Sequence, residues 1–69
     1  MTQTLEKKTK LQKDNDRIRF AFSVWHKRMY EPSYANIEKR IDLPQSTLSN
    51  WMRGRDMNRE RLEKIKSIL

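Results

Sequence analysis

Several residue types that build common functional sites are rare or missing in this sequence. It contains no cysteine and a single histidine. The lack of cysteine excludes disulfides, thiolate zinc sites and thiol nucleophiles, and one histidine cannot form a histidine-based metal cluster. We therefore expect no bound metal and no other cofactor.

Long apolar runs are also missing. No stretch approaches the roughly 18 apolar residues that a membrane-spanning helix needs. The first ten residues contain no apolar segment like that of a secretory signal. We expect a protein that does not act at a membrane and that works in the cytoplasm.

The chain has only 69 residues. This length allows one domain with one small core, but it does not allow a deep pocket walled by a second domain. We therefore expect a protein that is not an enzyme.

Glycine and proline, which mark turns, are scarce as well. One glycine and two prolines are too few for the many turns of a β-protein, and no long stretch alternates apolar and polar residues. The sequence therefore predicts an all-α fold.

Apolar residues at helical spacing predict four helices. The expected helices are residues 16–30, a short helix after Ser33, residues 45–53 and residues 58–69. Pro32 ends the first helix, and Gly54 suits a left-handed C-cap of the third. The apolar residues expected in the core are Ile18, Phe22, Trp25, Met29, Ile37, Ile41, Leu48, Trp51, Met52, Leu62, Ile65 and Leu69. An alternative role for the two tryptophans is to stack on single-stranded bases. Both lie among the apolar residues at helical spacing, however, which favours a place in the core.

Basic residues dominate the charge. Sixteen Lys and Arg against nine Asp and Glu give a net charge of +7. Residues 1–13 hold four lysines against Glu6 and predict a flexible basic N-terminal arm ahead of a domain at residues 14–69. This arm is either a solubilising tail or a segment that wraps a DNA duplex. Residues 43–55 contain no acid, which suits a phosphate-binding surface but also arises by chance in a basic chain.

The third expected helix has two different faces. One face is apolar, and the other carries only amide, hydroxyl and guanidinium groups, from Gln45, Ser46, Ser49, Asn50 and Arg53. Any solvated helix shows polar residues opposite an apolar stripe. In the major groove of DNA, however, Gln and Asn form paired hydrogen bonds with adenine, and Ser or Thr can serve several bases. The polar face is therefore a candidate for reading DNA.

The segment Ser33–Arg55, SYANIEKRIDLPQSTLSNWMRGR, resembles the helix-turn-helix of Cro and the phage repressors, the XRE-like family. The positions that carry the resemblance are Ile37, Ile41, Asp42 at the turn, Leu43, Leu48, and Trp51 with Gly54 as W-x-x-G. The resemblance covers 23 of the 69 residues. It implies a small four-helix, lambda-repressor-like domain with its helix-turn-helix unit at residues 33–55.

Three positions differ from the family pattern. Asp42 stands where the family has a turn glycine, so we expect Asp42 at positive φ. Pro44 replaces the Ser or Thr that caps the recognition helix, a loss of about 1 kcal/mol. Glu38 takes a position that many members fill with a small residue, and we interpret it as neutral.

The resemblance implies a sequence-specific regulator of transcription that binds double-stranded DNA in a phage or a bacterium. Its site would be a palindromic operator, and the bound protein would be associated with the nucleoid. The implied base contacts are Gln45, Ser46 and Asn50, followed by Thr47 and Ser49. The implied phosphate contacts, from the start of the second helix, the end of the third and the N-terminal arm, are Ser33, Tyr34, Arg53, Arg55, Lys8 and Lys10.

Two other functional classes stay open. The first is a helix-turn-helix module that binds a protein in place of DNA, such as an antirepressor or an antitoxin-like protein. The second is a nonspecific binder of nucleic acid. A protein-binding surface would use large apolar anchors. Residues 45–55 are instead rich in amide side chains, so they favour DNA as the partner.

Phe20 and Val24 do not fit the apolar stripe of the first expected helix. At 100° per residue they lie roughly 160° and 120° away from it, so one solvated helix would leave both in water. We expect a cover, either from a homodimer or a regulatory protein partner, or from the N-terminal segment of the same chain.

Overall fold

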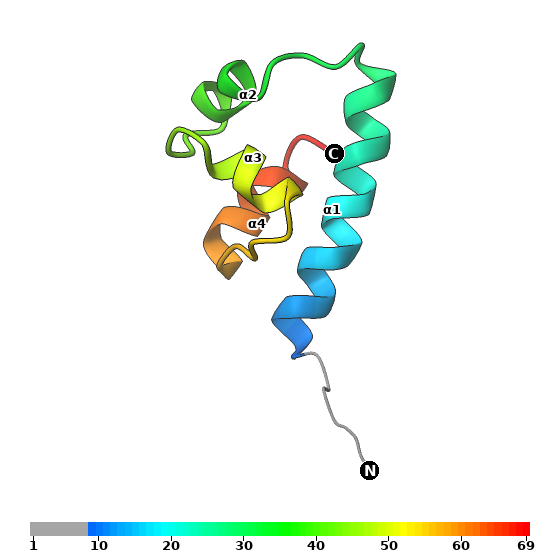
Figure 1. The fold of residues 1–69 in the computed structure, drawn as a ribbon, viewed down its shortest axis with the longest axis vertical. Helices are drawn as coiled ribbons and strands as arrows, with labels where there is room; N and C mark the ends of the chain where they lie inside the picture. The colour runs from blue at the N-terminus through cyan, green and yellow to red at the C-terminus, as the bar shows by residue number, and fades with distance from the viewer. Residues whose placement is uncertain (1–8) are drawn as a thin grey trace.

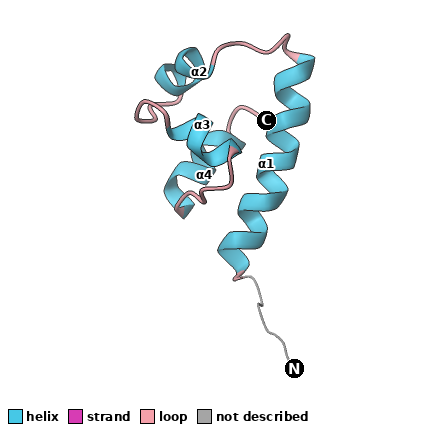
Figure 2. Cartoon of the chain, in the orientation of Figure 1, coloured by secondary structure: helices cyan, strands magenta, loops and turns pink. Residues whose placement is uncertain are grey.

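The fold is all-helical. The computed structural model describes residues 9–69, and its helices are α1 (Lys10–Arg28), α2 (Tyr34–Arg40), α3 (Thr47–Met52) and α4 (Arg59–Lys66) (Figures 1 and 2). No strand occurs in this part of the chain. The expected all-α class with four helices is confirmed.

Helix α1 begins six residues earlier than the sequence predicted. Thr9 and Gln12 form a capping box: the Thr9 hydroxyl accepts the backbone N–H of Gln12 at 3.1 Å, and the Gln12 side chain accepts the N–H of Thr9 at 2.8 Å. The expectation of a flexible arm over residues 1–13 is therefore wrong for residues 10–13, and residues 1–8 lie outside the described part. The helix also ends earlier, at Arg28, because Tyr30 and Glu31 have positive φ.

The four helices enclose one core. Helix α1 runs beside the group formed by the other three; it packs against α4, while α2 packs against α3 (Figure 1). The rings of Phe22 and Trp51 meet edge to face at 5.6 Å in the centre. The buried apolar residues are Ile18, Phe22, Ile37, Leu43, Leu48, Trp51, Met57, Leu62 and Ile65.

Five of the expected core residues are less buried than predicted. Trp25, Ile41 and Met52 pack against the core but are only half-buried. Met29 is 51% exposed, because α1 stops just before it. Leu69 is 46% exposed, because α4 ends at Lys66 and does not continue to residue 69. The burial predicted from the apolar stripes is therefore correct in the middle of each helix and wrong near the helix ends.

The turns between helices follow the sequence closely. The Ser33 hydroxyl caps α2 by accepting the N–H of Asn36 at 3.2 Å. Asp42 has a φ of 59°, as expected for the residue at a glycine position. Gly54 has a φ of 117° just after α3, which allows the N–H of Arg55 to reach the carbonyl of Asn50 at 3.1 Å. None of the helices in residues 9–69 is both long and apolar enough to cross a bilayer.

Candidate nucleic-acid interface

Helix α3 is capped by a buried carboxylate from α2. Glu38 is 4% exposed, and its Oε2 accepts the N–H of Leu48 at 2.8 Å while its Oε1 accepts the N–H of Ser46 at 3.3 Å. Ser46 itself has a φ of 70° and makes no capping hydrogen bond with its side chain. The interpretation of Glu38 as neutral missed this role, because the capping group lies ten residues away in the sequence. Glu38 supplies the acceptor that Pro44 cannot provide.

The inner side of α3 is also held by a buried amide from α1. Asn15 is fully buried, and its Oδ1 accepts both the indole N–H of Trp51 and the N–H of Met57, each at 2.8 Å. Its Nδ2 donates to the carbonyls of Leu11 and Met57 at 2.9 and 3.1 Å. All four hydrogen-bonding positions of the amide are used. Asn15 therefore links α1, α3 and the segment before α4.

Arg19 fixes the C-terminal end of α3. Its Nε donates to the carbonyl of Trp51 at 2.7 Å, and its guanidinium lies 5.3 Å from the centre of the Trp51 ring. Its Nη2 bonds the carboxylate of Asp56 at 3.1 Å. Because Arg19 and Asn15 both reach α3 from α1, the inner side of α3 is fixed by hydrogen bonds as well as by packing.

The residues predicted to read bases all lie at α3 or just before it. Thr47, Ser49 and Asn50 are half-buried residues of the helix, whereas Gln45 and Ser46 are exposed in the turn that precedes it. The predicted start of this helix at residue 45 is wrong, because the left-handed backbone of Ser46 interrupts it. The Ser49 hydroxyl donates to the carbonyl of Ser46 at 3.2 Å, so its proton is already used.

A small hollow of about 100 Å³ joins this polar side of α3 to α4. Its lining residues are Gln45, Thr47, Asn50, Arg55, Asp56, Met57 and Arg61. Three of the predicted base readers are thus brought together with two arginines. The only acid in the hollow, Asp56, is paired with Arg19. Arg61 was not predicted from the sequence, because nothing in the local pattern shows how α4 is placed beside α3.

The predicted phosphate contacts are more dispersed. Arg53 is exposed at the end of α3, near the hollow that Arg55 lines. Ser33 caps α2, and the ring of Tyr34 packs 5.1 Å from that of His26. Lys10 is the first residue of α1, and this end of α1 lies away from α3 (Figure 1). Lys8 lies outside the described residues.

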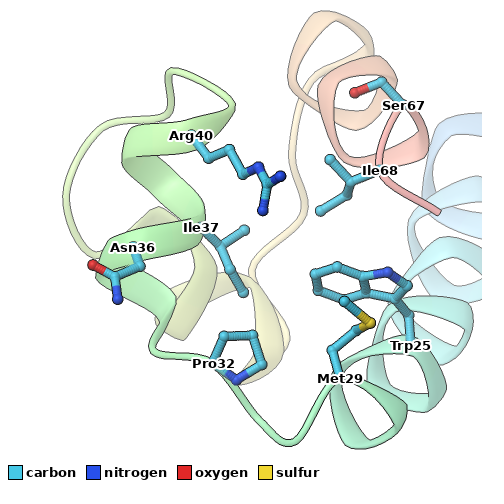
Figure 3. Close-up of a pocket in the computed structure, with 8 residues that line it drawn as sticks. All are labelled: Trp25, Met29, Pro32, Asn36, Ile37, Arg40, Ser67 and Ile68. Carbon is cyan, nitrogen blue, oxygen red and sulfur yellow. The ribbon is translucent and has the colours of Figure 1, made fainter.

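A larger cleft of about 470 Å³ opens elsewhere on the molecule. Trp25 of α1 and Met29, just after α1, face Ile37 of α2 across it, and Arg40 extends its guanidinium toward it (Figure 3). The remaining lining residues are Pro32, Asn36, Ser67 and Ile68. The cleft shares no lining residue with the hollow beside α3, so the two are separate sites.

Phe20 and Val24 are exposed, as their helical positions predicted. They are 72% and 44% exposed on the side of α1 that faces away from the core. They do not join the residues around α3.

No protein-family model, curated protein or solved structure matches this chain. Among residues 9–69, no three His, Cys, Asp or Glu side chains are grouped so that they could hold a metal ion.

Proposed function

We propose that α2, the turn at Asp42 and α3 form a helix-turn-helix of the Cro and phage-repressor type. In this proposal the chain binds double-stranded DNA with sequence preference through the outer side of α3 and regulates transcription. The observation that carries it is the hollow beside α3, where Gln45, Thr47 and Asn50 meet Arg55 and Arg61. Amide groups suited to base edges lie there next to guanidinium groups suited to phosphates.

The size and rigidity of α3 support this function. An α-helix is about 10–12 Å across with its side chains, which matches the width of the major groove, about 12 Å. Leu48 and Trp51 are fully buried on its inner side, and Glu38 fixes its start. A helix held from both ends can present its outer side chains without a further ordering cost on binding.

The charges around α3 favour DNA over a protein partner. Exposed Arg53 and the arginines of the hollow surround the polar side chains, and the acid between them is neutralised by Arg19. Large apolar anchors, which protein interfaces use, are not among the lining residues except for buried Met57.

Selection of binding sites from random duplexes tests the proposal. We expect enrichment of a preferred sequence, palindromic if two copies bind together. Gln45→Ala and Asn50→Ala should each lose about 1 to 3 kcal/mol on the selected site and much less on random DNA. Fluorescence anisotropy with both duplexes measures these losses.

A matched control is Asn36→Ala, which removes the same amide group from the separate cleft and should leave DNA affinity unchanged. Equal losses on selected and random DNA would contradict the assignment of base contacts. If no sequence is enriched at low salt, the protein-binding alternative, an antirepressor or antitoxin-like module, replaces the DNA-binding one.

A further inference from the structure

The outer side of α1 carries a second surface with its own chemistry. At 100° per residue one continuous face of α1 collects seven residues. They are Lys10, Lys13, Arg17, Phe20, Val24, Lys27 and Arg28, and all seven are exposed. We call these seven residues the outer α1 face. It combines five positive charges with two apolar side chains and has no acid.

The five basic residues of the outer α1 face form no ion pair with other described residues. Exposed basic residues, or one exposed apolar residue, are ordinary on a chain of net charge +7, but here Phe20 and Val24 are exposed side by side among the basic residues. The apolar pair at i and i+4 is the kind of anchor that a partner helix covers.

The charge pattern excludes a second copy as a favourable cover. If two α1 helices crossed antiparallel at Phe20 and Val24, Arg17 of one copy would meet Lys27 of the other. Like charges placed opposite each other across an interface are unfavourable. The same repulsion opposes a parallel pairing of the two faces.

The other anionic partners fit less well. A DNA backbone would use the positive charges but leave Phe20 and Val24 in water. A bilayer surface requires a broad apolar sector, whereas here basic side chains flank only two apolar residues. A helix with an apolar seam between rows of Glu or Asp matches both the apolar pair and the charges beside it.

We propose that the outer α1 face is the docking site for an acidic amphipathic helix of a partner protein. This surface is independent of DNA binding by α3, because Asn15 and Arg19, which hold α3, project from the opposite side of α1. One molecule can therefore hold the partner helix and a duplex at the same time.

The test uses a synthetic helical peptide as long as α1, with a leucine seam flanked by glutamates. The control peptide has the same composition in scrambled order. Isothermal titration at low salt should show binding of the first peptide only, with affinity that falls as salt rises. Phe20→Ser/Val24→Ser should weaken binding by about tenfold or more, because both apolar contacts are lost.

A charge-matched pair of variants isolates the electrostatic part. Lys13→Glu/Lys27→Glu and Lys39→Glu/Arg40→Glu both change the net charge from +7 to +3. Only the first pair lies on the outer α1 face, so it should weaken peptide binding by about tenfold or more, and the second by about twofold at most. DNA binding by Phe20→Ser/Val24→Ser should equal that of the parent chain.

Three results would overturn the proposal. They are equal binding of the seam and scrambled peptides, a folded parent chain whose self-association is lost in Phe20→Ser/Val24→Ser, and tighter binding to phosphatidylserine vesicles than to the peptide. If Phe20→Ser/Val24→Ser unfolds in circular dichroism, Lys13→Glu/Lys27→Glu tests the peptide contact in its place, and unchanged peptide binding by that folded variant would also overturn the proposal.

Discussion

At the scale of single residues, Asn15 is the polar group on which the core depends most. It is fully buried, and every donor and acceptor of its amide is paired. A buried polar group is tolerated only when such bonds replace those it would make to water. The hydrogen bond from the Trp51 indole N–H to Asn15 also fixes the orientation of Trp51, the largest side chain in the core.

Asn15→Ala should therefore be strongly destabilising. It leaves the N–H groups of Trp51 and Met57 buried without their acceptor, which costs about 2 to 4 kcal/mol, a large share of the stability of so short a chain. Urea unfolding followed by tryptophan fluorescence measures the loss. Asn36→Ala, at an exposed amide, should stay within about 0.5 kcal/mol of the parent chain. A similar small change for Asn15→Ala would show that water replaces the amide.

Asp42 is a second residue whose backbone conformation determines the effect of substitution. Its φ of 59° favours glycine, and the hydrogen bond from Lys64 at 2.8 Å goes to its backbone carbonyl, which glycine retains. The carboxylate is fully exposed and 3.6 Å from Lys64, so this ion pair contributes little. Asp42→Gly should be neutral or stabilising by a fraction of a kcal/mol in a thermal melt. Asp42→Ala removes the same charge but keeps a Cβ at positive φ, and should be less stable than Asp42→Gly by about 1 kcal/mol. Equal melting temperatures for the two would show that the backbone is unstrained there.

At the scale of helices, the middle of each element is predictable and its ends are not. Periodic apolar residues such as Ile18 and Phe22 identify α1, because one face of the helix must be buried. Its start depends on Thr9 and Gln12, a local pair that lies in a basic stretch and was assigned to the arm. The start of α3 depends on Glu38, a carboxylate from another helix, and no pattern within α3 reveals it. The polar side of α3 could be predicted from the residues of α3 themselves. Arg61 could not be predicted as part of this site, because only the packing of α4 brings it to the hollow beside α3.

Helices α1 and α4 are joined by an ion pair that makes stability depend on pH. Arg59 donates to Asp14 at 2.6 Å, and this hydrogen bond lowers the pKa of the Asp14 carboxyl below 3.8; burial acts in the opposite direction, and nearby positive charges reinforce the lowering. A carboxyl with a lowered pKa stabilises the fold fully above its unfolded pKa and loses this contribution as pH falls through the folded one. The parent chain should therefore exceed Asp14→Asn in stability at neutral pH, and the difference should shrink below about pH 4.

Chemical unfolding of both chains at several pH values measures this difference. Arg59→Gln removes the partner of Asp14, so it should reduce the same pH-dependent contribution to the stability of the fold. The double variant Asp14→Asn/Arg59→Gln should lose less than the sum of the single losses, since the two groups act as a pair. A difference that stays constant down to acidic pH would show that the pair does not contribute to stability.

At the scale of the whole molecule, five acids within residues 9–69 form ion pairs, whereas the basic residues of two surfaces form none. The ion pairs within residues 9–69 join Arg19 to Asp16 and Asp56, Arg59 to Asp14, Lys64 to Asp42, and Lys66 to Glu63. The arginines at the hollow beside α3 and the basic residues of the outer α1 face take no part in them. These two surfaces can therefore attract different anionic partners at long range.

The salt dependence of DNA binding distinguishes these two basic surfaces. If the hollow beside α3 faces a duplex, Arg61 contacts a phosphate and releases a counterion on binding. Arg61→Ala should weaken selected and random DNA alike and reduce the slope of log K against log salt by about 1. Lys27→Ala removes the same charge from the outer α1 face and should leave both the affinity and the slope unchanged. Anisotropy titrations at several salt concentrations give both values for each variant. A slope that changes with Lys27→Ala and stays constant with Arg61→Ala would place the duplex on α1 and would contradict the function proposed for α3.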